Sequence, residues 1–524
     1  MQADNNNLTK EISPKPTAKG SQFPTVIIGG GIAGLTAALH LSERGLKPLV
    51  LEADPEFCGG RWGAIAAERL PTQGEWVFPA EHGIHGLWWQ YKNLKAMAQR
   101  YNFMPDLILA NRQLWVHGEA SGKVRSAEMG RGVRRTLWPA PFHYGALFFH
   151  PTFFRMITFR DIFASPIVLG SLLTALGVDP LIEARALEGA TLADFCKGWS
   201  PRMTAFLASL ARSGLSAHPE DVPLAGFIAF LRFYSALRRD SQRFHFLSGN
   251  PQTLFIEPML KRIVEFGGEV RKGTRVVRME RWNKMGWKLY LESGETLEAA
   301  HVILATDAPS AHKLLAATPA TREVTENMTW PQGLETAVVR YWFSEALPKR
   351  AVEAGIISGD FAIDNFFWLH CIQAEFVKWH KATGGSAIEA HIYNQESLAL
   401  DDAALLVKVE QNLARLFPTL KGKVIHATLH RNEATHTLFG VGSLAQHIGV
   451  RTPWPGLSCC GDWVRHPIPA LFLERACATG IAAANVVLEM NQQAPFPLKN
   501  YDKPELLARF VGLWVKSVRG TVKR

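Results

Sequence analysis

Residues 25–61 read TVIIGGGIAGLTAALHLSERGLKPLVLEADPEFCGGR, and this stretch decides the fold. Its β-branched start, residues 26–28, predicts a short buried strand, and the helix formers after the glycines predict a helix. Between them Gly29, Gly31 and Gly34 form a G-x-G-x-x-G turn. The first glycine of such a turn permits the tight bend, the second lets the backbone approach a pyrophosphate, and the third lets helix and strand pack closely.

A second strand and an acidic residue complete this unit. Residues 48–51 predict the strand, and Glu52 closes it. A carboxylate about 20 residues after the last glycine is where the ribose diol of a dinucleotide is held. The free N–H groups and the dipole at the start of the helix favour phosphate. We therefore predict a dinucleotide site; the alternative is a turn of the same type that binds no ligand.

The length and composition indicate a globular protein of more than one domain. The chain has 524 residues, of which 47% are hydrophobic and 20% are charged, and a chain of this length exceeds one ordinary core. Its six cysteines show no C-x-x-C spacing, which argues against zinc and iron–sulfur sites and fits a reducing compartment. The net charge of +10 favours an anionic partner, either nucleic acid or a membrane. We favour the membrane, because no nucleic-acid motif occurs.

Neither end of the chain nor its interior predicts a membrane-spanning helix. The polar leader, residues 1–23, contains no apolar run and is therefore not a secretory signal. No stretch reaches about 18 uninterrupted apolar residues, which is the length that crosses a bilayer. We expect a flexible leader and a protein without a transmembrane helix.

Three regions predict contact with a membrane surface or, alternatively, ordinary packing. Residues 137–163 are rich in aromatic side chains with arginines between them, and residues 224–237 continue the theme at helical spacing. They predict either an aromatic core or a substrate tunnel whose mouth rests on a bilayer. The tail, 493–524, predicts a helix with Pro504 and Glu505 in its first turn, either docked on the protein or lying in the membrane plane. Its apolar stripe comprises Leu506, Leu507, Phe510, Val511, Trp514, Val515 and Val518.

The second half of the chain alternates predicted strands and helices. Residues 269–278 predict a strand, a turn and a strand. A hairpin over residues 287–298 and a separate buried strand over 302–306 follow. The insertion from about residue 309 to 454 is predicted to contain strands at 337–343 and 387–393, a helix at 401–417 and, from His426, a strand followed by a loop.

Histidines form two groups that could bind a metal. His82 and His85 lie three residues apart, and three more occur at 426, 430 and 436. The first group has no third ligand at a suitable spacing, and the second is spread along an extended segment, so neither predicts a metal face. We expect no metal site.

A second glycine–acid element lies near the C-terminus. Residues 454–463 predict a strand that ends in Gly461 and Asp462, and residues 473–490 predict a helix after a proline-rich turn. This helix again brings its N-terminal N–H groups to the end of a buried strand.

Four segments resemble the superfamily of FAD-dependent amine oxidases and phytoene desaturases. Within it the sequence resembles the carotene desaturase branch, of the β-carotene desaturase/methylase (isorenieratene synthase-like) type, from Thr25 to about Met490. The segments are CGGR at 58–61, EHGIHGLW at 81–88, HRNEATHTLFGVGS at 430–443 and CCGDWVRHPIPALFLERACATGIAAAN at 459–485.

This resemblance implies FAD rather than NAD as the dinucleotide. Arg61, His82 and His85 are implied to lie near the flavin, and no catalytic base is assigned. The residues expected to bind the cofactor are Gly29, Gly31, Gly34, Glu52, Gly60, Arg61, Val276, Val277, Gly461 and Asp462.

The implied fold class is α/β. A Rossmann-type (GR2-like) FAD-binding domain is interleaved with an α+β substrate domain. The expected FAD-binding segments are 24–95, 244–308 and 454–492, and the substrate domain comprises 96–243 and 309–453, between the leader and the basic amphipathic tail.

The implied activity is FAD-dependent oxidation of a carotenoid or other polyene, a desaturation with or without methyl migration. Such a substrate implies a peripheral position on the cytoplasmic side of a membrane, with an acceptor such as a quinone or O₂ and no nucleic acid. Three alternatives share the fold: a flavin-dependent carotene cis–trans isomerase, an amine oxidase, and a flavin-free prenyl-lipid carrier of the GDP-dissociation-inhibitor type. The complete glycine turn with Glu52 and Asp462 argues against the carrier.

Overall fold

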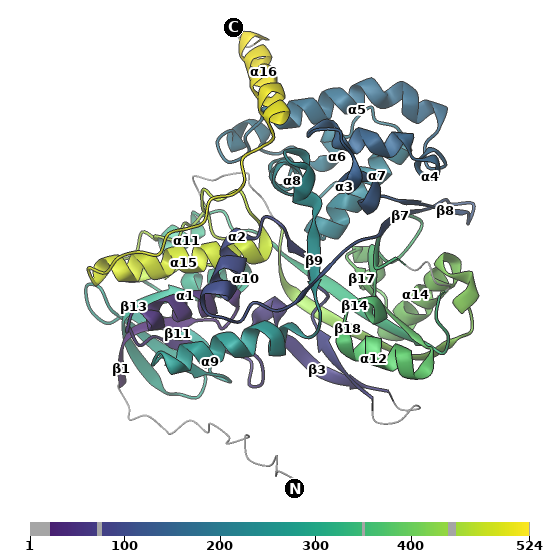
Figure 1. Cartoon of the computed structure of the whole chain (residues 1–524). Helices are drawn as coiled ribbons and strands as arrows, with labels where there is room; N and C mark the ends of the chain where they lie inside the picture. The colour runs from purple at the N-terminus through teal and green to yellow at the C-terminus, as the bar shows by residue number, and fades with distance from the viewer. Residues whose placement is uncertain (1–20, 71–75, 348–351, 439–446, 523–524) are drawn as a thin grey trace.

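The computed structural model of the protein describes residues 21–70, 76–347, 352–438 and 447–522. Most of the predicted leader and residues 439–443 of the third family-like segment lie outside this part. Figure 1 shows two regions of sheet, one at the lower left and one at the lower right, with a group of helices above them. Each of the two main sheets has seven strands.

The first sheet has a parallel part and an antiparallel edge, as expected of a Rossmann-type domain. Its order is β10-β2-β1-β13-β12-β11, and β19 also pairs with β13. All pairs are parallel except β13–β12 and β12–β11. The strands are β1 Ser21–Ile28, β2 Leu49–Leu51, β10 Glu269–Arg271, β11 Val276–Arg281, β12 Trp287–Leu291, β13 Thr296–Leu304 and β19 Leu457–Cys459.

Three helices in the described part of the chain pack beside this sheet. They are α1 (Ile32–Glu43), α9 (Glu257–Glu265) and α15 (Phe472–Met490), and Figure 1 shows them together at the lower left. A Cβ atom on Gly480 of α15 would lie 2.4 Å from the carbonyl oxygen of Ala33, so α1 and α15 pack backbone to backbone. The N-terminal and C-terminal cofactor elements predicted from the sequence are therefore adjacent in space.

The predicted separation of residues 295–298 from the strand at 302–306 is wrong. Most of both segments belongs to β13, a single strand of nine residues, Thr296–Leu304. Its first half pairs antiparallel with β12, and its last three residues pair parallel with β19 along the same edge. The sequence changes character within the strand because its first half alternates between buried and less buried positions, whereas its end is buried on both faces.

The second sheet has the order β18-β14-β17-β16-β15-β7-β8. Helices α12 (Ala374–Thr383) and α14 (Asp402–Leu416) lie beside it at the lower right of Figure 1. Its strands are β7 Gln113–Gly118, β8 Val124–Glu128, β14 Gly333–Phe343, β15 Ala354–Gly359, β16 Asn365–Trp368, β17 Ser386–Ile392 and β18 Val424–Thr437.

The prediction of a strand followed by a loop after His426 is wrong. β18 is one strand of 14 residues. Its partner β14 provides backbone pairs from Gly333 opposite Thr437 to Phe343 opposite Val424, and two register shifts absorb the irregular spacing. The polar composition of the segment hid this strand, because its hydrogen bonds come from a partner almost a hundred residues away.

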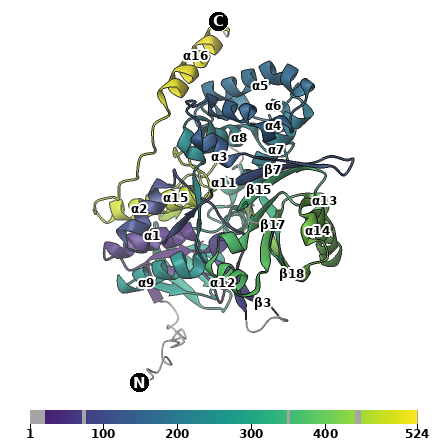
Figure 2. The ribbon, with the colours of Figure 1, turned by 45° about the vertical axis from the view of Figure 1, so that its right-hand side comes forward.

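A third part of the molecule is helical and includes α5 (Phe159–Gly177), α7 (Pro201–Leu215) and α8 (Leu224–Leu231). In Figure 2 α5 lies at the top of the molecule, far from α9. Of the two alternatives for residues 224–237, an aromatic core and a membrane-facing tunnel mouth, the structure supports the core. All residues of α8 are buried, as are Phe233 and Tyr234 after it, so this stretch is core.

The remaining elements connect these parts. Two small sheets join β3 (Ala64–Arg69) to β4 (Val77–Glu81) and β9 (Phe244–Leu247) to both β5 (Leu87–Trp88) and β6 (Leu107–Leu109). The other α-helices are α2 Lys92–Arg100, α3 Gly130–Arg135, α4 Pro151–Phe154, α6 Leu192–Phe195, α10 Ala308–Ala317, α11 Arg322–Glu326, α13 Gln395–Leu398 and α16 Leu506–Val522.

The tail crosses the molecule and ends in α16, which begins just after Glu505 (Figure 1). On the way the hydroxyl of Tyr501 donates to Glu474 of α15 at 3.0 Å. The carboxylate of Glu505 accepts from the backbone N–H groups of Ala140 and Arg239 at 3.0 and 2.9 Å. The segment between α15 and α16 therefore links the first sheet to the helical part.

Helix α16 docks on α5 with only part of its apolar surface. Ala508 and Val515 are buried, and a Cβ on Gly177 of α5 would lie 2.5 Å from Val515. The predicted stripe is therefore split, since Phe510 and Trp514 remain 67% and 62% exposed. The sequence predicted either a docked helix or a helix with an outward apolar face. In the structure α16 has both, because one part of its surface contacts α5 and another part is exposed.

Candidate cofactor site

The glycine turn has the close packing and the open space that a dinucleotide requires. A Cβ on Gly34 would lie 2.0 Å from the carbonyl oxygen of Gly29, so helix and strand approach through these two residues. Around Gly31, in contrast, no atom beyond its own chain neighbours lies within 4 Å of the position of an added Cβ. This space, at the N-terminus of α1, is where a pyrophosphate would approach the backbone.

Glu52 lies beside this turn at the end of β2. Its Oε2 accepts a hydrogen bond from the N–H of Gly30 at 2.7 Å, and its Oε1 accepts from the N–H of Asp54 at 2.9 Å. Each carboxylate oxygen retains a second lone pair for a ligand hydroxyl. Glu52 therefore shapes the turn besides being in place to hold a ribose.

The segment before β11 passes next to Glu52, which places the predicted pair Val276 and Val277. The N–H of Thr274 donates to the carbonyl oxygen of Glu52 at 2.7 Å, and β11 begins two residues later. Val276 is partly buried, whereas Val277 is 47% exposed. The backbone just before β11 thus lies next to Glu52, the residue expected to hold the ribose.

The loop at residues 58–61 closes against the glycine turn. The N–H of Gly59 donates to the carbonyl oxygen of Gly30 at 2.8 Å, and a Cβ on Gly60 would lie 3.4 Å from the Cα of Gly31. Gly59 has a φ of +114°, in the left-handed region where a side chain would be strained. The predicted Gly60 and Arg61 are therefore held at the edge of the open space.

Arg61 joins the two ends of the site. Its Nη2 lies 2.5 Å from Oδ2 of Asp462, across 401 residues of chain. Asp462 also accepts a hydrogen bond from the Thr437 hydroxyl at 3.2 Å. The structure thus joins a predicted residue of the loop at 58–61 to one of the C-terminal glycine–acid element, in a partly buried ion pair.

His436 is a site residue that the sequence reasoning did not select. Its Nδ1 lies 3.3 Å from Nη1 of Arg61. Burial, together with the positive charge of Arg61, lowers the pKa of His436 to about 3, so the imidazole is neutral and accepts this contact. One feature of the sequence could have pointed to His436, since it lies within the family-like segment 430–443. The number of residues between His436 and Asp462 does not indicate that the two lie close together.

The turn after Asp462 is fixed by α15. The N–H of Gly461 donates to the hydroxyl of Thr479 at 3.0 Å. The buried guanidinium of Arg475 donates to the carbonyl oxygens of Ala470, Val464 and Ile468 at 2.9 to 3.1 Å. The helix thereby holds the whole turn that approaches the cofactor space.

His82 and His85 have different partners. Nδ1 of His82 lies 2.9 Å from the side-chain oxygen of Asn432, whose amide nitrogen donates to the His82 carbonyl oxygen at 2.9 Å. Nδ1 of His85 lies 3.9 Å from Oε2 of Glu81. Burial lowers the pKa of His82, and the nearby His85 and Arg61 lower it further, while the hydrogen bond with Asn432 opposes this. Within the described residues no cluster of metal-ligating side chains occurs.

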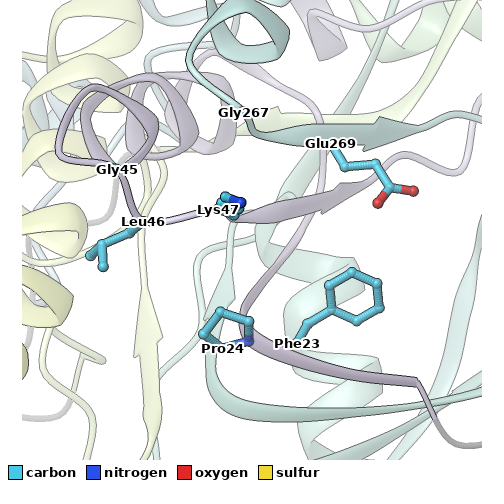
Figure 3. Close-up of a pocket in the computed structure, with 7 residues that line it drawn as sticks. All are labelled: Phe23, Pro24, Gly45, Leu46, Lys47, Gly267 and Glu269. Atoms are coloured by element: carbon cyan, nitrogen blue, oxygen red, sulfur yellow. The ribbon is translucent and has the colours of Figure 1, made fainter.

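A surface pocket elsewhere on the first sheet is not part of this site. Figure 3 shows it beside the starts of β1, β2 and β10, whereas the glycine turn and Glu52 follow the ends of β1 and β2. It is lined by Phe23, Pro24, Gly45, Leu46, Lys47, Gly267 and Glu269. In open α/β sheets ligands bind at the carboxyl ends of the strands, so this pocket does not compete with the candidate site.

The geometry agrees with a comparison against protein families. Residues 32–488 match the family described as flavin containing amine oxidoreductase. The chain belongs to this family. It is an FAD-dependent oxidoreductase, and the predicted cofactor, enzyme class and superfamily are confirmed. The flavin-free carrier considered from the sequence is thereby excluded.

Individual relatives of this flavoprotein confirm the predicted branch. The chain is 28% identical to the carotenoid phi-ring synthase of Streptomyces griseus over 500 residues, which cover 91% of each chain. It is 26% identical to the chloroplastic/chromoplastic 15-cis-phytoene desaturase of Capsicum annuum over 302 residues, covering 56% of this chain and 47% of the desaturase.

Solved structures confirm the fold of the flavoprotein. Cyclohexylamine oxidase from Brevibacterium oxydans superimposes with a TM-score of 0.65 at 16% identity, over 90% of this chain and 100% of the oxidase. At this identity the likeness shows the α/β fold, as predicted, and nothing about the substrate.

Proposed function

We propose that this flavoprotein oxidises the ring of a carotenoid, by desaturation with methyl migration. The observation that carries the proposal is the end-to-end match with a carotenoid phi-ring synthase. The match with phytoene desaturase covers about half of each chain and supports the broader class of polyene substrate.

The residues of the site fit FAD. The open space at Gly31 accommodates the pyrophosphate, Glu52 offers free lone pairs for ribose hydroxyls, and the Arg61–Asp462 pair supplies charged groups between the two halves of the site. When bound there, FAD supplies the two-electron oxidant. The protein contributes binding and orientation; for example, Asn432 fixes the ring of His82.

We also propose that the protein takes its substrate from a membrane surface. The support is an apolar outer surface on α5 and α16, which lie at the same end of the molecule in Figures 1 and 2. The aromatic residues Phe159 and Phe163 are 82% and 83% exposed. The surface is defined by the exposed residues Phe159, Ile162, Phe163, Ile167, Leu506, Phe510, Leu513, Trp514 and Val518.

Within the described residues α5 is the one helix long and apolar enough to cross a membrane by length and composition, and it is 22% buried. We favour an in-plane position. Its C-terminal end packs against α16 through Gly177, and Asp161 caps its start. Arg160, Arg509 and Lys516 are exposed beside the apolar side chains, as in helices that lie at a lipid interface.

The proposal is tested by anaerobic incubation of the holoenzyme with β-ring carotenes in liposomes, followed by product chromatography and flavin absorbance. Bleaching of the flavin with formation of an aromatic-ring product is expected. Rearranged double bonds without flavin bleaching would indicate a cis–trans isomerase. Absence of any carotene product, with bleaching by amines, would indicate an amine oxidase.

A further inference from the structure

A small, partly open cavity lies next to the cofactor site. Trp62, which follows Arg61 directly, forms part of its wall. The cavity has room for about one water molecule. Its lining residues are Trp62, Glu81, Ile84, His85, Leu247, Gly249, Pro251 and Gln373.

Three polar atoms of this lining have no hydrogen-bond partner in the protein. They are Oε2 of Glu81, Nδ1 of His85 and the side-chain oxygen of Gln373, all buried. The other carboxylate oxygen of Glu81 accepts from Nε2 of Gln373 at 2.8 Å, which fixes both side chains. Buried polar atoms are normally satisfied by protein or ordered water, so a water bound among these three atoms accounts for the arrangement.

His85 extends from the cavity to a solvent-accessible position. Its Nδ1 is buried and faces Glu81 at 3.9 Å, a separation that a water can bridge. The side chain as a whole is 31% exposed, so the exposed part of the ring lies away from Glu81. An imidazole in this position can receive a proton on one nitrogen and release one from the other.

The surroundings make Glu81 a stronger base than an ordinary carboxylate. Burial raises the pKa of Glu81, and the nearby carboxylate of Glu389 raises it further, while His85 and Arg340 oppose the rise. Glu389 itself stays ionised: despite its burial, Arg340 at 2.7 Å and His391 at 2.7 Å lower its pKa to about 2. Of the two buried carboxyl groups, Glu81 is therefore the one that changes protonation.

We propose that Glu81, His85 and a water held with Gln373 form a relay that accepts the proton lost by the substrate during oxidation. This inference rests on the proposed function. One C–H electron pair of the polyene leaves as hydride to oxidised flavin. The neighbouring C–H bond breaks, its electrons form the new C=C bond, and its proton goes to the exposed ring nitrogen of His85. The Nδ1 proton passes through the water to the Glu81 carboxylate, which becomes a neutral carboxyl group.

The test compares Glu81→Gln and His85→Phe with the matched control Glu68→Gln in the FAD-loaded enzyme. Glu68 also contacts Arg340, at 3.0 Å, but does not line the cavity. For the wild type and the control, kcat is expected to fall as the pH drops through the raised pKa of Glu81. For Glu81→Gln, kcat is expected to fall roughly 100-fold and to lose this pH limb, with KM and bound FAD unchanged.

A second measurement needs no substrate. Infrared spectra of the holoenzyme should show a protonated-carboxyl band that titrates over the same pH range in the wild type and disappears in Glu81→Gln. If Glu81→Gln retains the wild-type kcat and pH profile on a carotene, the relay is wrong although the function stands. If the wild type itself turns over no polyene, the proposed function fails, and the relay fails with it.

Discussion

The cofactor site and the apolar outer surface are built on opposite principles. At the site, half-buried and buried polar groups hold one another: Arg61 pairs with Asp462, Glu52 holds the Gly30 amide, and Arg475 secures a turn. On the outer surface, large side chains such as Phe159 and Phe163 face outward. The first region is therefore sensitive to any added or lost atom, whereas the second should tolerate substitution in solution and respond only when a lipid surface is present.

The largest effect is expected where the site leaves no room for a side chain. In Gly34→Ala the new methyl group would lie 2.0 Å from the Gly29 carbonyl oxygen, and overpacking of this kind costs about 3 kcal/mol or more. We expect little folded, yellow protein, measured by circular dichroism and flavin absorbance. Gly31→Ala, which meets no protein atom, is the matched control and should fold but bind FAD weakly. Equal behaviour of the two variants would contradict the assignment of the open space.

Asp462→Ala should affect the cofactor more than the fold. It removes the partner of Arg61 and the acceptor of Thr437, and hydrogen bonds to charged groups contribute about 1.5–3 kcal/mol each. We expect FAD affinity to fall roughly 100-fold, so that the purified protein is partly or wholly colourless. The ratio of flavin to protein measures this. Full flavin occupancy with unaltered affinity would remove Asp462 from the site.

Glu52→Ala should weaken FAD by about tenfold to a hundredfold, since a charge-assisted contact with the ribose contributes about 1.5–3 kcal/mol. Glu52→Gln retains one oxygen for a backbone amide and should lose less. Titration of the apoprotein with FAD distinguishes the two. Unchanged affinity in both variants would mean that Glu52 only shapes the turn.

Trp514→Ser tests the other side of the comparison. Its indole is 62% exposed. Full burial of a large apolar side chain contributes about 1.5–3 kcal/mol, and insertion into a lipid interface provides most of that burial. We expect roughly tenfold weaker sedimentation with anionic liposomes, with unchanged FAD content. Val407→Ser on α14, where Val407 is 56% exposed, is the control. Equal binding by both variants would contradict a lipid-facing α16.

Glu81→Gln should have the smallest effect on the fold, and the size of this effect depends on pH. Because burial raises the pKa of Glu81, the folded state binds the proton more tightly than the unfolded state. The contribution of Glu81 to the free energy of unfolding is therefore fully present below its pKa in the unfolded state. This contribution is lost as the pH rises through its higher pKa in the folded state. We expect Glu81→Gln to gain stability relative to the wild type over this range, by about 1 kcal/mol, measured by thermal unfolding at several pH values.

The cofactor-binding elements could be predicted because their requirements are local. Gly29, Gly31 and Gly34 are spaced by the geometry of a single turn, and Glu52 follows by a fixed distance along the chain. The contact between Arg61 and Asp462 could be anticipated only through the family resemblance, since nothing in their spacing reveals it.

Features that depend on contacts with distant parts of the chain could not be predicted from the sequence. The continuity of β18 is set by β14, the burial of Phe227 by the surrounding helices, and the split face of α16 by its contact with Gly177. His436 and the pair of Glu81 with His85 likewise gain their properties from burial and from neighbours on other elements. Periodicity within one segment contains none of this information.

The distance along the chain between Arg61 and Asp462 has a consequence during synthesis. The N-terminal strand β1 leaves the ribosome long before its neighbours β13 and β19, so its apolar edge has no partner while several hundred residues are still being made. Unpaired strand edges promote aggregation. The nascent chain is therefore expected to need chaperones that cover this edge, and flavin can be loaded only after residue 462 has emerged. A yellow colour then reports that synthesis has passed Asp462.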